Sequence, residues 1–350
     1  MSLSTITAAE AMAAPDGYDT IIDARSPSEF AEDRLPGAVN WPVLDDAERA
    51  EVGTIYTQVS TFEARKRGAA IVSRNIARLI DEHIAGLGRE WRPLVYCWRG
   101  GQRSGSFAIV LAQIGFRTRQ LQGGYKAYRE LVRNELTELP LGFDWRVLGG
   151  RTGSGKTRLL AALAAEGAQV LDLEALAAHR GSVLGELPDQ PQPSQKEFDS
   201  RIWHALRGFD PARPVFVERE SRRIGRLQLP DAVLQAWHDR GRAIQVELSP
   251  AERVALLTEE YAFFTRDVGA LNERLQALTE LRGKATVARW QSLAASGDWP
   301  TLVTELMQQH YDPLYDRATR AFADAANIET ITLSDARPAT LADAARHLAG

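Results

Sequence analysis

A glycine-rich motif near the middle of the chain constrains the fold more than any other feature of the sequence. Residues 146–149 have the apolar character of a buried strand, residues 150–157 read GRTGSGKT, and helix-forming residues 157–165 follow. The motif fits the pattern G-x-x-x-x-G-K-[ST], and a strand before it and a helix after it are the context that a P-loop requires. We therefore predict an α/β domain of the P-loop NTPase type that begins at residue 146.

The P-loop pattern predicts a diphosphate-binding site, because the backbone amides of such a loop and the start of its helix surround phosphate oxygens. Lys156 would reach the outer phosphate and Thr157 could hold Mg²⁺. The predicted diphosphate-binding residues are Gly150, Gly153, Ser154, Gly155, Lys156 and Thr157. The candidates for an acid that faces the loop, or alternatively lies in a solvated turn, are Asp172, Glu218 and Glu220. Apart from Mg²⁺ at Thr157, we expect no metal and no tightly bound cofactor.

The single cysteine of the chain, Cys97, marks a second candidate site. It follows the apolar predicted strand 94–96 and precedes a loop with two glycines and a predicted helix at 104–114. Ligands of parallel sheets bind beyond the carboxyl ends of strands, and a helix start and arginine side chains would lower the pKa of the thiol. We predict that Cys97 is a reactive nucleophile supported by Arg99 and Arg103, with a buried structural cysteine as the alternative. The predicted anion-binding loop contains Gly100, Gly101, Gln102 and Ser104.

Other segments around Cys97 resemble a known domain family. Residues 23–30 (DARSPSEF), 35–40 (LPGAVN) and 121–125 (LQGGY), together with the Cys97 loop, resemble a rhodanese domain over about residues 8–135. Such domains carry sulfur or selenium on the cysteine. The loop spacing departs from the pattern, since many sulfurtransferases have Cys-x4-Arg and this chain has Cys97-x5-Arg103. That spacing also resembles cysteine-dependent phosphatases of rhodanese-like fold.

The two motifs in this order resemble the tRNA 2-selenouridine synthases, in which a rhodanese domain precedes a P-loop domain. Further segments that carry the resemblance are 53–59, 62–65, 171–174, 179–182, 192–195 and 220–225. The resemblance implies a transferase that converts 2-thiouridine at the tRNA wobble position into 2-selenouridine. It also implies an S-geranyl-2-thiouridine intermediate, geranyl diphosphate and selenophosphate as substrates, and Cys97 as the selenium carrier. The alternatives are a sulfurtransferase coupled to a P-loop ATPase or kinase, and a phosphatase-like enzyme.

We thus expect an α/β chain with a rhodanese domain at 8–135, a linker at 136–145 and a P-loop domain at 146–350 that is mostly helical after residue 251. Residues 61–160 hold 18 Lys and Arg against 8 Asp and Glu, whereas the rest of the chain holds 24 against 38. This basic third indicates an anionic partner such as tRNA, or else a solvated basic face.

The expected location is the cytoplasm. There is no run of about 18 apolar residues that would span a membrane, and the first residues lack the pattern of a signal peptide. One cysteine allows no disulfide framework within the chain and fits a reducing compartment. The expected partners are tRNA and a supply of selenophosphate, with no membrane. The sequence leaves the oligomeric state open and favours a monomer.

Overall fold

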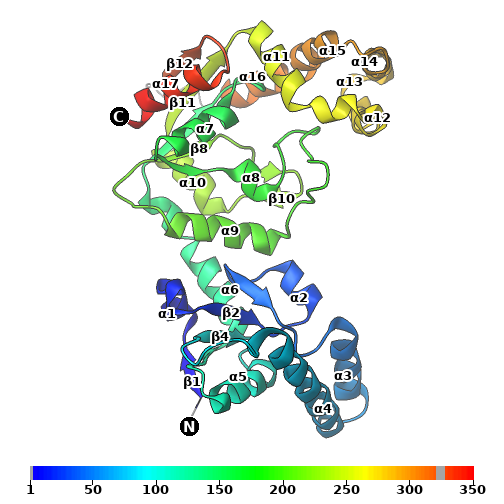
Figure 1. Cartoon of the computed structure of the whole chain (residues 1–350). Helices are drawn as coiled ribbons and strands as arrows, with labels where there is room; N and C mark the ends of the chain where they lie inside the picture. Colours follow the sequence, from blue (N-terminus) through cyan, green and yellow to red (C-terminus); the bar gives the residue numbers. More distant parts are fainter. Residues whose placement is uncertain (1–2, 321–327) are drawn as a thin grey trace. The chain divides into compact units, whose positions relative to one another are not determined.

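The computed structural model describes residues 3–320 and 328–350, and the chain forms two compact units (Figure 1). The first unit contains the chain up to Leu136 together with Pro193–His204, and the second contains Thr137–Gln192 and Ala205–Gly350. The chain therefore passes between the units three times. Both units are α/β, as predicted, and each is built on a five-stranded sheet in which all strands are parallel.

The sheet of the first unit has the strand order β1-β5-β4-β2-β3. Its strands are β1 (Ser4–Ile6), β2 (Thr20–Asp23), β3 (Ala38–Asn40), β4 (Pro93–Tyr96) and β5 (Arg119–Leu121). Its helices are α1 (Ala8–Ala13), η1 (Pro15–Gly17), α2 (Pro27–Glu32), α3 (Asp46–Gln58), α4 (Thr61–Leu79), η2 (Ile80–Ile84), α5 (Gln102–Ile114) and α6 (Gly124–Glu135). All four residues of β4 are buried. A central parallel strand is covered on both faces, which explains its uninterrupted apolar sequence.

A helix from later in the chain, α9 (Gln195–Arg207), supplies most of the second segment of this unit. Ser200 donates a hydrogen bond of 3.0 Å to the buried carboxylate of Asp33, and Arg129 forms a 2.9 Å ion pair with Asp199. These polar contacts place residues 193–204 in the first unit, whereas the sequence analysis assigned them to the P-loop domain. The difference arises because the partners of α9 lie far from it in the sequence.

The sheet of the second unit has the strand order β12-β11-β6-β8-β7. Its strands are β6 (Trp145–Gly149), β7 (Gln169–Leu171), β8 (Val215–Glu218), β11 (Arg242–Leu248) and β12 (Glu329–Leu333), and β9 (Arg223–Ile224) pairs with β10 (Leu227–Gln228) in a separate antiparallel hairpin. The helices around the sheet are η3 (Leu139–Gly142), α7 (Lys156–Ala165), α8 (Leu173–Ala177), α10 (Asp231–Arg240) and α17 (Pro338–Ala349). The expected linker thus contains a 3₁₀ turn, and its last residue, Trp145, already begins the central strand.

Helices dominate the chain after β11, as predicted. They are α11 (Pro250–Glu260), η4 (Ala262–Thr265), α12 (Val268–Gln276), α13 (Thr279–Arg282), α14 (Lys284–Ser296), α15 (Trp299–Leu306), η5 (Met307–Tyr311) and α16 (Asp312–Arg320). This region has a hydrophobic core of its own, with Leu275 and Trp290 fully buried within it. Among the residues that the structure describes, no helix combines the length and apolar character needed to cross a membrane.

Candidate functional site

Cys97 lies at the carboxyl end of β4, the central strand of the first sheet, and only 3% of its surface is exposed. The Ser104 hydroxyl donates a hydrogen bond of 3.1 Å to Cys97 Sγ. Ser104 in turn accepts a 2.9 Å hydrogen bond from Gln120 Nε2, and the same amide donates to the carbonyl of Gly100 at 2.8 Å. A neutral donor is therefore fixed at the sulfur atom, where it would stabilise negative charge. The sequence analysis included Ser104 in the loop but did not identify Gln120.

Two glycines allow the Cys97 loop to pack against the turn that follows β5. Gly100 has φ of 63°, and a Cβ placed on it would lie 2.6 Å from the carbonyl oxygen of Leu121. Gly124 has φ of 57°, and a Cβ there would collide with the carbonyl oxygen of Cys97. Residues with side chains rarely adopt these conformations. Both positions therefore need glycine for the loop to close around the cysteine.

The two arginines expected to support Cys97 have different surroundings. Arg103 forms an ion pair of 2.6 Å with Glu29, which also lies 3.2 Å from Arg49. Burial disfavours charge on Glu29, but the bonds and charge of Arg103 hold the pKa of this carboxyl below its usual value. Arg99 is exposed at the surface of the loop. Thus Arg99 is accessible to a ligand, whereas Arg103 is paired with a carboxylate. Gly101 and Gln102, two residues of the predicted anion-binding loop, are exposed at the start of α5.

The predicted P-loop connects β6, the central strand of the second sheet, to α7. Gly150, Gly153 and Gly155 have φ of 153°, 78° and 86°. A Cβ on Gly150 would lie 2.6 Å from the carbonyl oxygen of Val246, and one on Gly153 would lie 2.7 Å from Leu257 Cγ. The glycines of the motif thus permit both the loop conformation and its close packing on neighbouring elements.

The cation and the hydroxyl of the motif converge on one acid at the end of β8. The Lys156 ammonium lies 3.4 Å from Glu218 and donates a 3.0 Å hydrogen bond to the carbonyl of Gly150. Thr157 donates a 3.0 Å hydrogen bond to the same Glu218 carboxylate. Glu218, one of the three candidate acids, therefore faces the P-loop.

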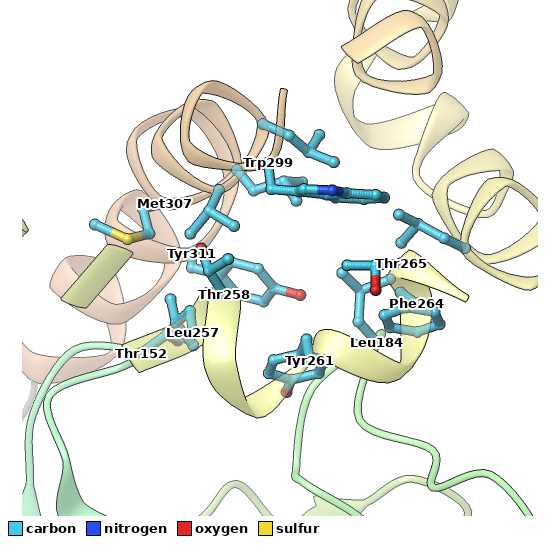
Figure 2. Close-up of a pocket in the computed structure, with 14 residues that line it drawn as sticks. Thr152, Leu184, Leu257, Thr258, Tyr261, Phe264, Thr265, Trp299, Met307 and Tyr311 are labelled. Carbon is cyan, nitrogen blue, oxygen red and sulfur yellow. The ribbon is translucent and has the colours of Figure 1, made fainter. Parts of the chain in front are cut away.

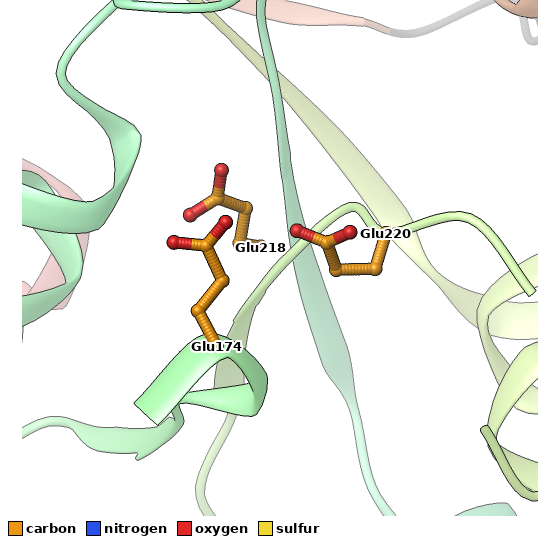
Figure 3. Close-up of side chains that lie close together, drawn as sticks. All are labelled: Glu174, Glu218 and Glu220. Atoms are coloured by element: carbon orange, nitrogen blue, oxygen red, sulfur yellow. The ribbon is translucent and has the colours of Figure 1, made fainter. Parts of the chain in front are cut away.

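Three carboxylates gather beside the P-loop, and Figure 3 shows their oxygens turned toward one another. One oxygen from each of Glu174, Glu218 and Glu220 lies within 4.8 Å of the others. Burial, and next the negative charge of Glu218, raise the pKa of Glu174 to about 9 and that of Glu220 to about 8. Oxygen-rich clusters of this kind suit hard divalent cations such as Mg²⁺. Glu174 was not among the predicted acids.

Asp172 has a different role in the structure. Its Oδ1 accepts a 2.9 Å hydrogen bond from the backbone amide of Ala175, so Asp172 caps the start of α8. Short side chains with an oxygen acceptor are favoured at this helix position. Asp172 stands outside the group of three acids, but its cap orients the helix that presents Glu174.

The P-loop opens into a cleft of about 470 Å³ in the second unit. The segments 179–182 and 220–225, which carry the family resemblance, both reach this cleft through Arg180, Gly181, Ser182, Glu220 and Ser221. Gln192 connects the segment 220–225 to the end of α8, because its side-chain amide donates to the carbonyls of Ile224 and Ala177 at 3.0 and 3.3 Å. Distant motifs of the sequence thus converge around one phosphate-binding loop.

His310 is a further member of the cleft that the sequence analysis did not assign. It lies in the π-helical turn η5, and Arg282 Nε donates a 3.0 Å hydrogen bond to His310 Nδ1. A guanidinium can only donate, so Nδ1 is unprotonated and the hydrogen of the neutral ring is on Nε2. Burial, together with the charge of Arg282, lowers the pKa of His310 to about 4. His310 is therefore a neutral hydrogen-bond donor at neutral pH.

The folds and motifs of the two units define a class of protein in which a cysteine-bearing rhodanese-like domain precedes a P-loop domain. Residues 7–131 match the family of rhodanese-like domains, and residues 143–271 match the family described as the tRNA 2-selenouridine synthase AAA domain. Both domain types were predicted from the sequence and are confirmed.

Similarity to curated relatives extends over most of the chain. The tRNA 2-selenouridine synthase of Nitrosomonas europaea is 36% identical over 265 residues, which cover 75% of this chain and 68% of the relative. The proteins of the same name from Marinobacter nauticus and a Sulfurovum species are 32% and 31% identical, and each alignment covers 85% of this chain and 87% of the relative. The chain belongs to the tRNA 2-selenouridine synthase family.

Proposed function

We propose that this chain is a transferase that converts 2-thiouridine at the wobble position of tRNA into 2-selenouridine in two steps. The sulfur is first geranylated from geranyl diphosphate, and selenium from selenophosphate then displaces the S-geranyl group. The observation that carries the proposal is the presence, in one chain of this family, of a cysteine with a hydroxyl donor at its sulfur and a glycine loop suited to a diphosphate.

In the first step the thiouridine sulfur would attack the carbon that bears the diphosphate. The carbon–sulfur bond forms, the carbon–oxygen bond breaks, and the diphosphate leaves with the bonding electrons. The P-loop amides and the Lys156 ammonium would stabilise the charge that develops on this leaving group. A reaction with this leaving group explains why a modification enzyme would contain a P-loop.

A Mg²⁺ ion fits the donors beside the P-loop. Thr157 and Glu218 already contact each other there, and Glu174 and Glu220 add two more carboxylates. These residues would hold the ion, which would neutralise charge on a bound diphosphate. Because burial and neighbouring carboxylates raise the pKa values of Glu174 and Glu220, binding of the ion would favour loss of their protons.

In the second step the Cys97 thiolate would take the phosphoryl group of selenophosphate, and the phosphorus–selenium bond would break to release selenide. The selenide would bond to C2 of the uridine as geranylthiol leaves, and water would then free the phosphoryl group from Cys97 as phosphate. Burial keeps the Cys97 sulfur away from bulk solvent, and Ser104 provides a donor for a negatively charged chalcogen. Arg99 and Lys126 are exposed next to this loop and are suited to tRNA phosphates or selenophosphate. The phosphatase alternative has less support, since Arg103 is paired with Glu29.

The test is mass spectrometry of wobble nucleosides from 2-thiouridine tRNA incubated with the purified protein. With geranyl diphosphate alone we expect S-geranyl-2-thiouridine, and with added selenophosphate we expect 2-selenouridine. Neither product should form when ATP replaces geranyl diphosphate. Selenation that requires ATP and ignores geranyl diphosphate would contradict the proposal and support a carrier coupled to an ATPase.

A further inference from the structure

A second cavity adjoins the P-loop cleft within the second unit (Figure 2). It has a volume of about 60 Å³, and one wall is Thr152 of the P-loop itself. Leu257, Tyr261 and Tyr311 line both this cavity and the cleft. The two spaces are therefore neighbours that share a boundary. A single ligand could occupy both of them.

The walls of the cavity are almost entirely apolar. Leucine, valine, methionine and aromatic side chains form most of the lining, and no lining residue carries a charge. The hydroxyls of Thr258 and Thr265 donate to the backbone carbonyls of Val254 and Ala262, both at 2.7 Å, so they are satisfied within their own helical turns. Burial raises the pKa of Tyr261 and keeps it neutral. An apolar space of this kind favours hydrocarbon over water.

The cavity is structurally coupled to the phosphate-binding loop through α11. Arg253, on this helix, donates a 2.9 Å hydrogen bond to the carbonyl of Thr152 and forms a 2.6 Å ion pair with Asp312. One turn further along α11, Leu257 packs against Gly153 and also lines the cavity. The helix thus holds the apolar wall in a defined place relative to the loop.

We propose that this cavity binds the hydrocarbon chain of an allylic diphosphate whose diphosphate lies in the P-loop, and that its far wall limits the chain length. The inference rests on the proposed function, because it assumes that the P-loop receives a prenyl diphosphate. A nucleoside is a poorer occupant, since the polar edges of its base would be buried without partners. Trp299, which lies on the opposite side of the cavity from Thr152 in Figure 2, is the residue best placed to stop a longer chain.

The test compares binding of four ligands to the full-length protein by calorimetry: inorganic diphosphate and dimethylallyl, geranyl and farnesyl diphosphate. We expect the wild type to bind geranyl diphosphate at least tenfold more tightly than inorganic diphosphate. Val303→Phe narrows the cavity and should remove most of this preference, while binding of inorganic diphosphate stays within twofold of wild type. Trp299→Ala lengthens the cavity and should shift the preference toward farnesyl diphosphate.

A matched control is Leu281→Phe, which adds a similar ring at a position that is 67% exposed and lies outside the cavity. This variant should bind all four ligands like the wild type. Retained binding of inorganic diphosphate shows that a variant is folded. If Val303→Phe does not fold, Trp299→Ala alone tests whether the cavity holds the hydrocarbon chain.

The outcomes separate this inference from the proposed function. A wild type that binds geranyl diphosphate no more tightly than inorganic diphosphate would overturn both. A wild type that prefers geranyl diphosphate, with the same preference in the folded cavity variants, would overturn the cavity assignment alone.

Discussion

The Cys97 loop and the P-loop occupy the same kind of position in their sheets but carry different side chains. Each follows the central strand of a parallel sheet and leads into the start of a helix. After β4 the first residue is a nucleophile, Cys97, with the neutral donor Ser104 at its sulfur. After β6 the first residue is Gly150, and the charged groups Lys156 and Glu218 lie nearby.

This difference indicates how similar loops acquire different chemistry. In both places a strand, a glycine turn and a helix start follow one another, which is the backbone arrangement that suits an anion. A thiol at the first position adds the ability to form a covalent bond, whereas a glycine there leaves room for a ligand that binds and departs. If the two loops divide the reaction, changes at Cys97 should affect selenium transfer and changes in the P-loop should affect geranyl transfer.

The largest effect is expected for Cys97→Ser. A serine hydroxyl is a much weaker nucleophile toward selenophosphate than a thiolate, so 2-selenouridine should fall below detection while S-geranylation stays within about twofold of wild type. Mass spectrometry of both nucleosides in one digest measures this. Ser104→Ala, which keeps the sulfur and removes only its donor, should reduce selenation by about tenfold, equivalent to about 1.4 kcal/mol. Normal 2-selenouridine output from Cys97→Ser would contradict a role of Cys97 in selenium transfer.

Lys156→Ala tests the other loop. Loss of one cation at the departing diphosphate should slow geranyl transfer by about 10²–10³-fold, the usual effect of deleting a donor to developing charge. Selenation of tRNA that is already S-geranylated should continue, in contrast to Cys97→Ser. Single-turnover assays of the two half-reactions distinguish these cases. If Lys156→Ala bound geranyl diphosphate as tightly as wild type but lost ATP binding, the loop would be a nucleotide site.

A smaller effect concerns pH and stability of the second unit. The pKa of Glu174 is raised to about 9 by burial and by Glu218, compared with 4.5 in an unfolded chain. The folded state thus retains a proton that the unfolded state releases, so stability should fall as pH rises from about 4.5 to 9. Glu174→Gln should flatten this decline and raise the melting temperature at pH 8 by about 2–4 °C for each 1 kcal/mol recovered.

Thermal unfolding between pH 5 and pH 8.5 measures this effect. The control is Glu259→Gln, at an acid whose side chain is 70% exposed, and it should leave the slope of stability against pH unchanged. A slope in Glu174→Gln equal to that of wild type would show that the carboxylate cluster is not the source of the pH dependence.

The smallest effect is expected for Arg117→Glu, outside both loops. Arg117 is 75% exposed and has only a distant pairing with Glu90, at 3.7 Å. Removal of one phosphate contact should weaken tRNA binding a few-fold and reduce the slope of log K against log salt by about one. Geranyl diphosphate binding should not change. Arg337→Glu, in the acidic remainder of the chain, is the matched control, and an equal loss there would exclude a specific basic surface.

The sequence predicted those parts of the two sites whose residues are neighbours along the chain. The P-loop and the Cys97 loop are defined by local spacing, and the structure places both at central strand ends. The pairing of Arg103 with Glu29 joins residues 74 positions apart, and no local spacing in the sequence connects them. Glu174 was missed for a similar reason, because a separate helix brings it to Glu218.

Helices are easiest to predict from a sequence where their packing leaves a periodic pattern. The α4 helix buries one face, including Ile71 and Ile76. In contrast, α3 has no buried residue among its 13, so it shows no apolar stripe, and a capping box of Asp45 and Glu48 marks its start. The spacing of apolar residues along the sequence therefore indicates which face of a helix is buried, and it gives little sign of a helix that buries no face.

The insertion of Pro193–His204 into the first unit has a consequence for biosynthesis. A ribosome that has produced the chain up to Leu136 has not yet supplied the helix that satisfies Asp33 through Ser200. At ~5–20 residues per second, several seconds pass before that helix is made. By then the nascent chain already includes the whole P-loop. Synthesis therefore delivers the P-loop before the last helix of the first unit, although that helix packs within a unit whose other residues were made first.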